Sequence, residues 1–205
     1  MADFIETLKY KYKTSNVLMK LIFINILVFI LLKITAIFFT LFKIGDFDIF
    51  PYIAVPSEPT EWIKRFWTPI TYMFVHEGFW HILFNLLWLY WFGQIFMQYF
   101  TGRTLGSLYI LGGLSGALLY MIAFNTIPYY IDMGGGWMIG ASAAVMAIVM
   151  AAAFYRPDVR LNLFLLGRIK IIYIALFAFI LDFLSLDDIA NPGGHIAHIG
   201  GAVEG

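Results

Sequence analysis

The chain has 205 residues, of which 61% are hydrophobic, 19% aromatic and only 13% charged. A soluble domain of this size is rarely so apolar, and uncharged runs of about twenty residues predict membrane-spanning helices. The formal net charge is zero, which argues against a nucleic-acid partner, and the absence of cysteine excludes disulfides, zinc–thiolate sites and thiol catalysis.

The pattern of apolar runs predicts an all-α membrane protein. Residues 1–16 are polar and basic, and we expect a cytoplasmic segment there, followed by a single transmembrane domain over 17–205. Residues 43–77 form a long loop with prolines, acidic residues and aromatic side chains suited to the lipid headgroup layer. Six helices are predicted, at about residues 17–42, 79–100, 105–124, 140–156, 171–186 and from 194 onward. The sixth reaches only Gly205, too short to cross a bilayer, so we expect a truncated helix.

The distribution of basic residues predicts the orientation of these helices. With a cytoplasmic N-terminus, nine lysines and arginines lie in inner segments and three in outer loops, as the positive-inside rule requires. The nine are Lys9, Lys11, Lys13, Lys20, Arg103, Arg156, Arg160, Arg168 and Lys170, and the three are Lys43, Lys64 and Arg65. The second, fourth and sixth helices then enter from the outer face. We expect a multi-pass protein of a bacterial plasma membrane.

The fourth helix is too short to span the bilayer. Residues 141–155 make about 22 Å of helix, against a hydrocarbon core of roughly 30 Å. Its start must therefore lie below the outer surface, and the preceding loop with three glycines must dip inward. Irregular backbone is tolerated at that depth only when it is buried in protein or lines a water-filled cavity. The sequence thus places Ser142 in a wet pocket within the membrane.

Four polar side chains occur near the outer ends of these helices. His81 and Asn85 are one turn apart on the second helix, Ser142 opens the fourth and His198 lies in the sixth. Each has an ordinary structural interpretation, since intramembrane histidine and asparagine often join helices and serine often bonds back to its own helix. A serine in a first helical turn, however, lies beside free N–H groups that favour a developing oxyanion.

Small residues predict that the fourth and sixth helices pack closely. Ala197, Gly201 and Gly205 recur every four residues in the sixth, and the fourth is rich in alanine. Such packing brings His198 within reach of Ser142, so that Ser142 can act as the nucleophile and His198 as the base. No carboxylate has an obvious route to His198, because Asp182 lies on another helix and Glu204 on another face. The residues therefore favour a Ser–His dyad over a triad.

Two histidines of the sixth helix raise the question of a metal site. His195 and His198 are three residues apart and suit a shared metal ion, but no third ligand is evident from the sequence. We therefore expect no metal and no other cofactor. His76, close to His81 in the sequence, is interpreted as an interfacial or supporting residue.

These motifs resemble those of the rhomboid family of intramembrane serine proteases. The resemblance covers about residues 60–205 and rests on His81-x-x-x-Asn85, Gly140-x-Ser142 and Ala197-His198-x-x-Gly201-x-x-x-Gly205. It implies that Ser142 and His198 form the catalytic dyad. It also implies that His81, Asn85 and the Ser142 N–H form the oxyanion hole. Trp62 and Arg65 resemble a tryptophan–arginine element of the family's first loop, whereas Met146 stands where the family often has an aromatic ring.

The expected function is a monomeric serine endopeptidase that cleaves transmembrane protein substrates near the outer face of the lipid bilayer. Aromatic content and the resemblance suggest a lateral substrate gate between the second and fifth helices. Its members would be Trp88, Trp91, Phe179 and Phe183. One alternative is a non-catalytic rhomboid-like protein that binds membrane helices, which the intact site residues disfavour. The other is a small transporter, which would need several acidic residues at mid-membrane, where only Glu204 is available.

Overall fold

A computed structural model describes residues 2–45, 48–163 and 167–205 of the chain. The described part is mostly helical, and a long helix occurs at each of the six predicted positions. These helices are α2 (Val17–Phe42), α6 (Phe79–Phe96), α7 (Gly102–Thr126), α9 (Ser142–Tyr155), α10 (Ile171–Leu184) and α11 (Pro192–Glu204). Among the described helices, α2 and α7 are both long enough and apolar enough to cross a membrane.

The helix ends follow from local chemistry. Asn16 caps α2 by accepting a hydrogen bond from the Met19 amide at 2.9 Å, and Thr101 caps α7 in the same way through Thr104. Asn191 caps α11 by accepting from the Gly194 amide at 3.2 Å. At its other end α2 stops at Lys43, which adopts a left-handed conformation with φ of 52°.

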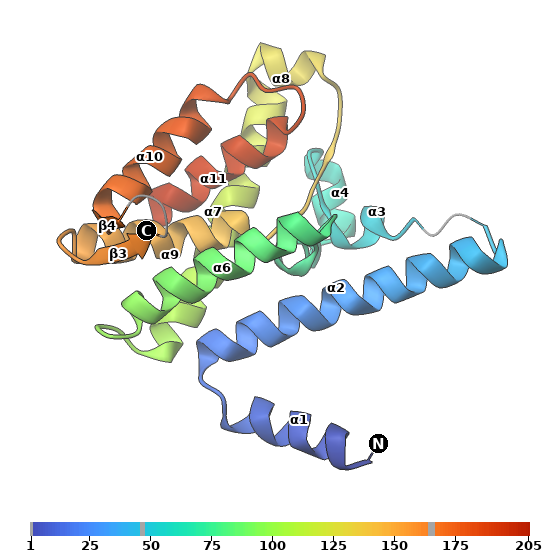
Figure 1. The fold of residues 1–205 in the computed structure, drawn as a ribbon. Helices are drawn as coiled ribbons and strands as arrows, with labels where there is room; N and C mark the ends of the chain where they lie inside the picture. Colours follow the sequence, from blue (N-terminus) through green and yellow to red (C-terminus); the bar gives the residue numbers. More distant parts are fainter. Residues whose placement is uncertain (1, 46–47, 164–166) are drawn as a thin grey trace.

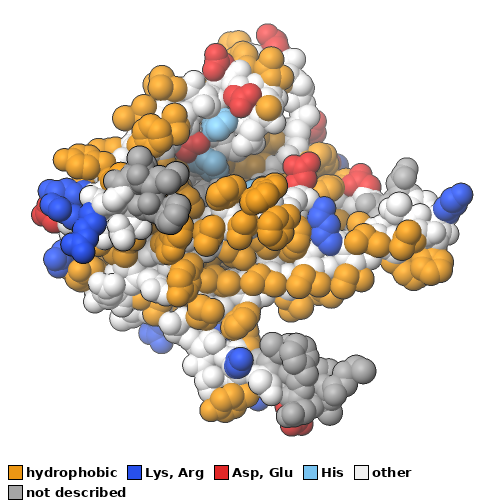
Figure 2. All heavy atoms as spheres, viewed as in Figure 1, with side chains coloured by type: hydrophobic (Ala, Val, Ile, Leu, Met, Phe, Trp, Pro, Cys, Tyr) orange, Lys and Arg blue, Asp and Glu red, His pale blue; other side chains and the backbone are white. Residues whose placement is uncertain are grey.

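The core is formed by α7, α9 and α11, which pack against one another. Figure 1 shows α1 (Ala2–Thr14) and α2 at one edge of the molecule and α10 at the opposite edge. On the side of α2, α6 packs against both α2 and α9, and α10 packs on α11 and α9. Large apolar side chains of α2 and α10 face outward, and Figure 2 shows hydrophobic side chains over much of the visible face. Such a surface suits lipid better than water.

Very close contacts between the core helices depend on glycine. A Cβ atom added at Gly201 on α11 would collide with the backbone carbonyl of Ala143 on α9, and one at Gly205 with that of Ala147. On the other side, a Cβ at Gly116 of α7 would lie 2.5 Å from the Ala143 Cβ. The prediction that small residues bring α9 and α11 together is confirmed.

The region predicted as loop between α2 and α6 contains short elements instead. These are α3 (Phe50–Ile53), β1 (Val55–Pro56), α4 (Pro59–Lys64), α5 (Thr68–Thr71) and a 3-10 turn, η1 (Tyr72–Phe74). Trp62 and Arg65 hold this region together, since their side chains donate to the carbonyls of Pro56 at 2.7 Å and Pro51 at 2.6 Å. A proline-rich composition favours a loop, but proline is well tolerated at the start of a short helix, where α3, α4 and α5 have it.

Further short elements complete the described chain. They are α8 (Pro128–Asp132), β2 (Trp137–Met138), β3 (Arg160–Leu163) and β4 (Gly167–Lys170). Strand β2 pairs antiparallel with β1, and β3 pairs antiparallel with β4. The β1–β2 pair fixes the segment that leads into α9, because it ties that segment to the region before α6.

Candidate active site

Ser142 is the first residue of α9, where the sequence placed it. The segment before it is held by two hydrogen bonds, from the Gly140 amide to the Tyr72 carbonyl at 3.0 Å and from the Gly136 amide to Ser57 Oγ at 3.0 Å. Because the first N–H groups of a helix lack partners inside the helix, the start of α9 presents donors around the Ser142 side chain. Such donors suit a negatively charged oxygen.

Gly140 brings His81 close to this helix start. Its φ of 124° is a conformation that side chains other than glycine's rarely adopt. A Cβ atom there would lie 2.8 Å from His81 Nε2 and 3.5 Å from Ser142 Oγ. The imidazole of His81 therefore lies over the backbone just before Ser142, in the space that a larger residue would fill.

A cavity of about 230 Å³ joins the predicted site residues from three helices. Its wall is formed by Phe84, Asn85, Trp88, Ser142, Val145, Met146 and His198. Asn85 donates one amide N–H to the His81 carbonyl at 2.9 Å, which leaves its second N–H for another acceptor. A second cavity, of about 540 Å³, has His81, Glu77 and the glycines of Gly134-Gly135-Gly136 in its wall.

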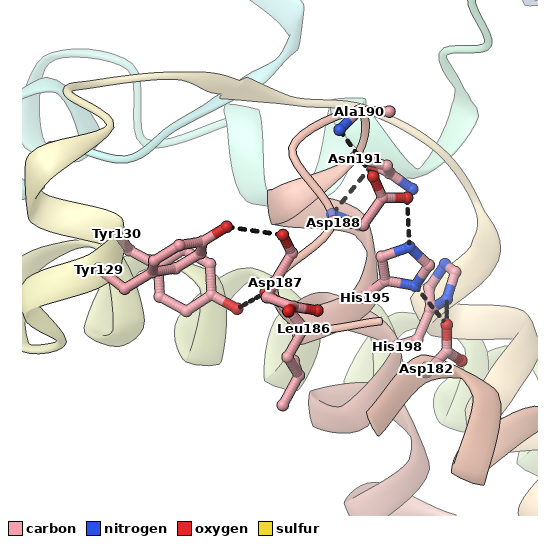
Figure 3. Close-up of polar contacts among 11 residues, drawn as sticks. Tyr129, Tyr130, Asp182, Leu186, Asp187, Asp188, Ala190, Asn191, His195 and His198 are labelled. Carbon is pink, nitrogen blue, oxygen red and sulfur yellow. Dashed lines mark hydrogen bonds and ion pairs between the residues drawn. The ribbon is translucent and has the colours of Figure 1, made fainter. Parts of the chain in front are cut away.

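His198 is held by a carboxylate, contrary to the expectation from sequence. Nδ1 of His198 lies 2.8 Å from Oδ1 of Asp182, and Nδ1 of His195 lies 2.8 Å from the same oxygen. Figure 3 shows both imidazoles converging on Asp182 from α11. The expectation that no carboxylate reaches His198 is wrong, because the turn after α10 folds α10 back along α11. The expectation that His195 and His198 lack a third potential ligand is wrong for the same reason.

The contact with Asp182 determines which nitrogen of His198 is free. A carboxylate accepts hydrogen bonds, so the neutral imidazole carries its proton on Nδ1 and exposes the Nε2 lone pair. His198 has about 19% of its side-chain surface exposed and Asp182 about 11%, so the pair is largely shielded from water. The arrangement resembles the histidine–carboxylate pairs that orient a general base.

The predicted gate residues are only partly brought together. Trp88 lines the cavity and stacks on Phe92, with ring centroids 5.4 Å apart. Phe179 packs against the core, whereas Trp91 and Phe183 are exposed. Phe84, which the sequence did not single out, lines the cavity one turn before Trp88. The gate stays a prediction.

The described chain is a mostly helical protein with two helices able to cross a membrane, and with a serine, a histidine and an asparagine around one cavity. The rhomboid domain family matches residues 64–205, more than half of the chain, and the chain therefore belongs to the rhomboid family. It is similar to the RHOMBOID-like protein 12, mitochondrial, of Arabidopsis thaliana, with 29% identity over 147 residues. The match covers 67% of this chain and 44% of that relative, so the chain spans less than half of the relative's length.

Proposed function

We propose that this protein is an intramembrane serine endopeptidase that cleaves transmembrane proteins. The observation that carries the proposal is the cavity shared by Asn85, Ser142 and His198, together with the contact that fixes His198 through Asp182. Family membership supports the same conclusion.

In the proposed mechanism, Ser142 Oγ attacks the scissile carbonyl while His198 Nε2 takes the hydroxyl proton. Collapse of the tetrahedral intermediate breaks the C–N bond, and the imidazolium of His198 returns its proton to the leaving amine. Water then attacks the acyl-enzyme and gives a proton to His198. That proton goes back to Ser142 Oγ as the carboxylic acid is released. Throughout, Asp182 faces the positive charge that forms on the ring.

The negatively charged oxygen of each tetrahedral intermediate needs hydrogen-bond donors around it. The Ser142 N–H, the free amide N–H of Asn85 and the ring of His81 are suitably distributed around the start of α9 for this role. Water is a co-substrate, and the larger cavity beside His81 offers a polar path for it. The wall of the same cavity includes the glycine-rich segment before Ser142, which the sequence predicts to dip into the membrane.

We further propose a monomeric six-span arrangement in the lipid bilayer, with a cytoplasmic N-terminus and the start of α9 near the outer face. The six long helices and the excess of basic residues in the predicted inner segments support it. Substrate helices would arrive sideways between α6 and α10, past Trp88 and Phe179. This route assigns the gate to Trp88, Trp91, Phe179 and Phe183.

Labelling by a fluorophosphonate tests the function directly, because this reagent reacts with an activated serine. We expect labelling of the wild-type protein in detergent and none of Ser142→Ala or His198→Ala. Ser115→Ala is the matched control, since Ser115 is also a helical serine but donates to Glu204 at 3.0 Å. Labelling that persists in Ser142→Ala contradicts the assignment. A folded wild-type protein that is never labelled would instead indicate a non-catalytic member of the family.

A further inference from the structure

The side chains of Asp182, His195 and His198 form a cluster that the hydrolytic mechanism uses only in part. One ligand atom from each lies within 4.8 Å of the other two. Hydrolysis requires His198 and benefits from Asp182, but it gives no role to His195. Nδ1 of His195 nevertheless lies 2.8 Å from the same carboxylate oxygen that Nδ1 of His198 contacts.

We propose that this cluster is an inhibitory site for a divalent transition-metal ion such as Zn²⁺. Two imidazole nitrogens and one carboxylate oxygen are a preferred donor set for zinc, which leaves its fourth position to water. The three donors come from two helices, α10 and α11, that pack against each other. The site is therefore largely preformed rather than assembled from mobile loops.

The distances fit an ion with small adjustments. Zinc binds nitrogen and carboxylate oxygen at about 2.0–2.2 Å, so two donors of one ion lie at most about 4.2 Å apart. The two nitrogen–oxygen distances of 2.8 Å are already inside this limit. All three donor atoms lie within 4.8 Å of one another, so the widest pair has to close by at most about 0.6 Å to come inside the limit.

The local charge and exposure also favour a cation. Asp188 Oδ2 lies 3.7 Å from Nε2 of His195, on the side of that ring away from Asp182, and Asp187 precedes it in the α10–α11 turn. His195 has 18% of its side-chain surface exposed, which gives an ion a path to the cluster. Figure 2 shows histidine surface within a hollow of this face, with acidic side chains beside it. The acidic side chains give this hollow a negative potential, which attracts cations.

Binding of the ion removes the catalytic base. The metal takes the Nδ1 lone pair of His198, so the proton that Nδ1 carried toward Asp182 moves to Nε2. The number of protons on the neutral ring is unchanged, but Nε2 becomes a donor and no longer accepts the proton of Ser142. The ion also binds the carboxylate of Asp182, which faces the imidazole of His198. The inhibitory consequence therefore rests on the proposed function, whereas binding itself does not.

Binding is tested with Co²⁺, a spectroscopic substitute for zinc, added to the Ser142→Ala protein. The chain has no cysteine and four histidines, so visible Co²⁺ bands report on very few possible sites. We expect bands that Zn²⁺ displaces, and at least about 100-fold weaker binding in Ser142→Ala/His195→Gln, since even changes to supporting residues cost 10–100-fold. His76→Gln, added to Ser142→Ala, is the matched control that should retain the bands. Absence of the bands, or their survival in the His195→Gln protein, overturns the metal site.

Inhibition is tested by the rate of substrate cleavage with and without Zn²⁺, compared as a ratio within each protein. We expect Zn²⁺ to slow cleavage by the otherwise wild-type protein, a chelator to restore it, and Mg²⁺ to have no effect. In His195→Gln the inhibiting Zn²⁺ concentration should rise at least about 100-fold. Equal inhibition of both proteins contradicts the proposal. A wild-type protein that binds Co²⁺ but never cleaves substrate or reacts with fluorophosphonate would refute the proposed function and leave the metal site standing.

Discussion

The carboxylate of Asp182 on α10 lies 2.8 Å from the imidazole Nδ1 of His198 on α11. A carboxylate inside an apolar helix is costly to bury unless it is paired. Here its Oδ1 accepts from two imidazoles, which accounts for its burial. The contact also sets the His198 tautomer with Nε2 free. The proposed active site therefore has three members in a row, Ser142, His198 and Asp182, rather than two.

We predict that Asp182→Asn lowers kcat by at least about 10²-fold with little change in KM. The variant retains a hydrogen-bond acceptor but loses the charge that faces the His198 imidazolium. In a soluble protease with such a triad, the same change costs about 10⁴-fold in kcat. Asp188→Asn is the matched control, because Asp188 contacts His195 and the Ala190 amide rather than His198, and should keep a rate close to wild type. A normal kcat in a folded Asp182→Asn protein would show that the pair is merely structural.

Removing an oxyanion donor should slow turnover without abolishing it. We expect Asn85→Ala to lower kcat by about 10²–10³-fold, which corresponds to about 3 kcal/mol, because the Ser142 N–H and His81 remain. Thermal unfolding of the purified variant checks that the loss is not one of folding. If Asn85→Ala and His81→Ala both cleave substrate at the full rate, the polar face of α6 only joins helices.

The packing of α11 on α9 predicts a stability effect. Gly201→Ala should lower the free energy of unfolding by about 1–3 kcal/mol, because the added methyl group meets the Ala143 carbonyl and forces the helices apart. The shift also moves His198 away from Ser142, so activity should fall before the protein unfolds. Gly78→Ser is the matched control, since nothing lies within 4 Å of a Cβ there and serine is a good N-cap. Equal melting temperatures for the two variants would contradict the close packing.

The sequence predicted the helices well and the partners of His198 poorly. The first long helix runs from Val17 to Phe42 as expected, because a long apolar run, broken only by single polar residues such as Lys33, determines it. Ser142 begins α9 because the glycines before it disfavour a helix and the alanines after it favour one. The contact between Asp182 and His198 depends instead on how the turn after α10 reverses the chain. Neither spacing nor hydropathy specifies that geometry.

Short elements were missed for a related reason. The pairing of Val55 with Met138 joins segments that are far apart in the sequence and only two residues long. No periodicity can appear in two residues, so the strands emerge only from tertiary contacts. The β3–β4 hairpin, Arg160–Leu163 and Gly167–Lys170, lies where the sequence showed only a basic connection. There Lys170 Nζ lies 2.6 Å from an Asp158 carboxylate oxygen and lowers the pKa of that carboxyl group.

His76 provides a prediction about pH and stability. It lies in the loop before α6, is 4% exposed, and neither ring nitrogen has a hydrogen-bond partner among the described residues. Burial lowers the pKa of His76 from its ordinary 6.5 to about 4, and the neighbouring His81 ring, with its centroid 5.0 Å away, adds to the effect. The folded protein therefore holds His76 neutral under conditions in which the unfolded chain protonates it.

The sign of the effect follows from this difference in proton binding. Below pH 6.5 His76 binds a proton in the unfolded state but not in the folded state. The free energy of unfolding therefore decreases as the pH falls. The decrease continues to about pH 4, where the folded protein also accepts the proton, and amounts to about 3 kcal/mol in total. We expect His76→Phe, which keeps an aromatic ring and cannot titrate, to remove most of this slope between pH 6.5 and 4. Chemical unfolding at several pH values measures it. Parallel stability curves for wild type and His76→Phe would show that His76 does not control acid stability.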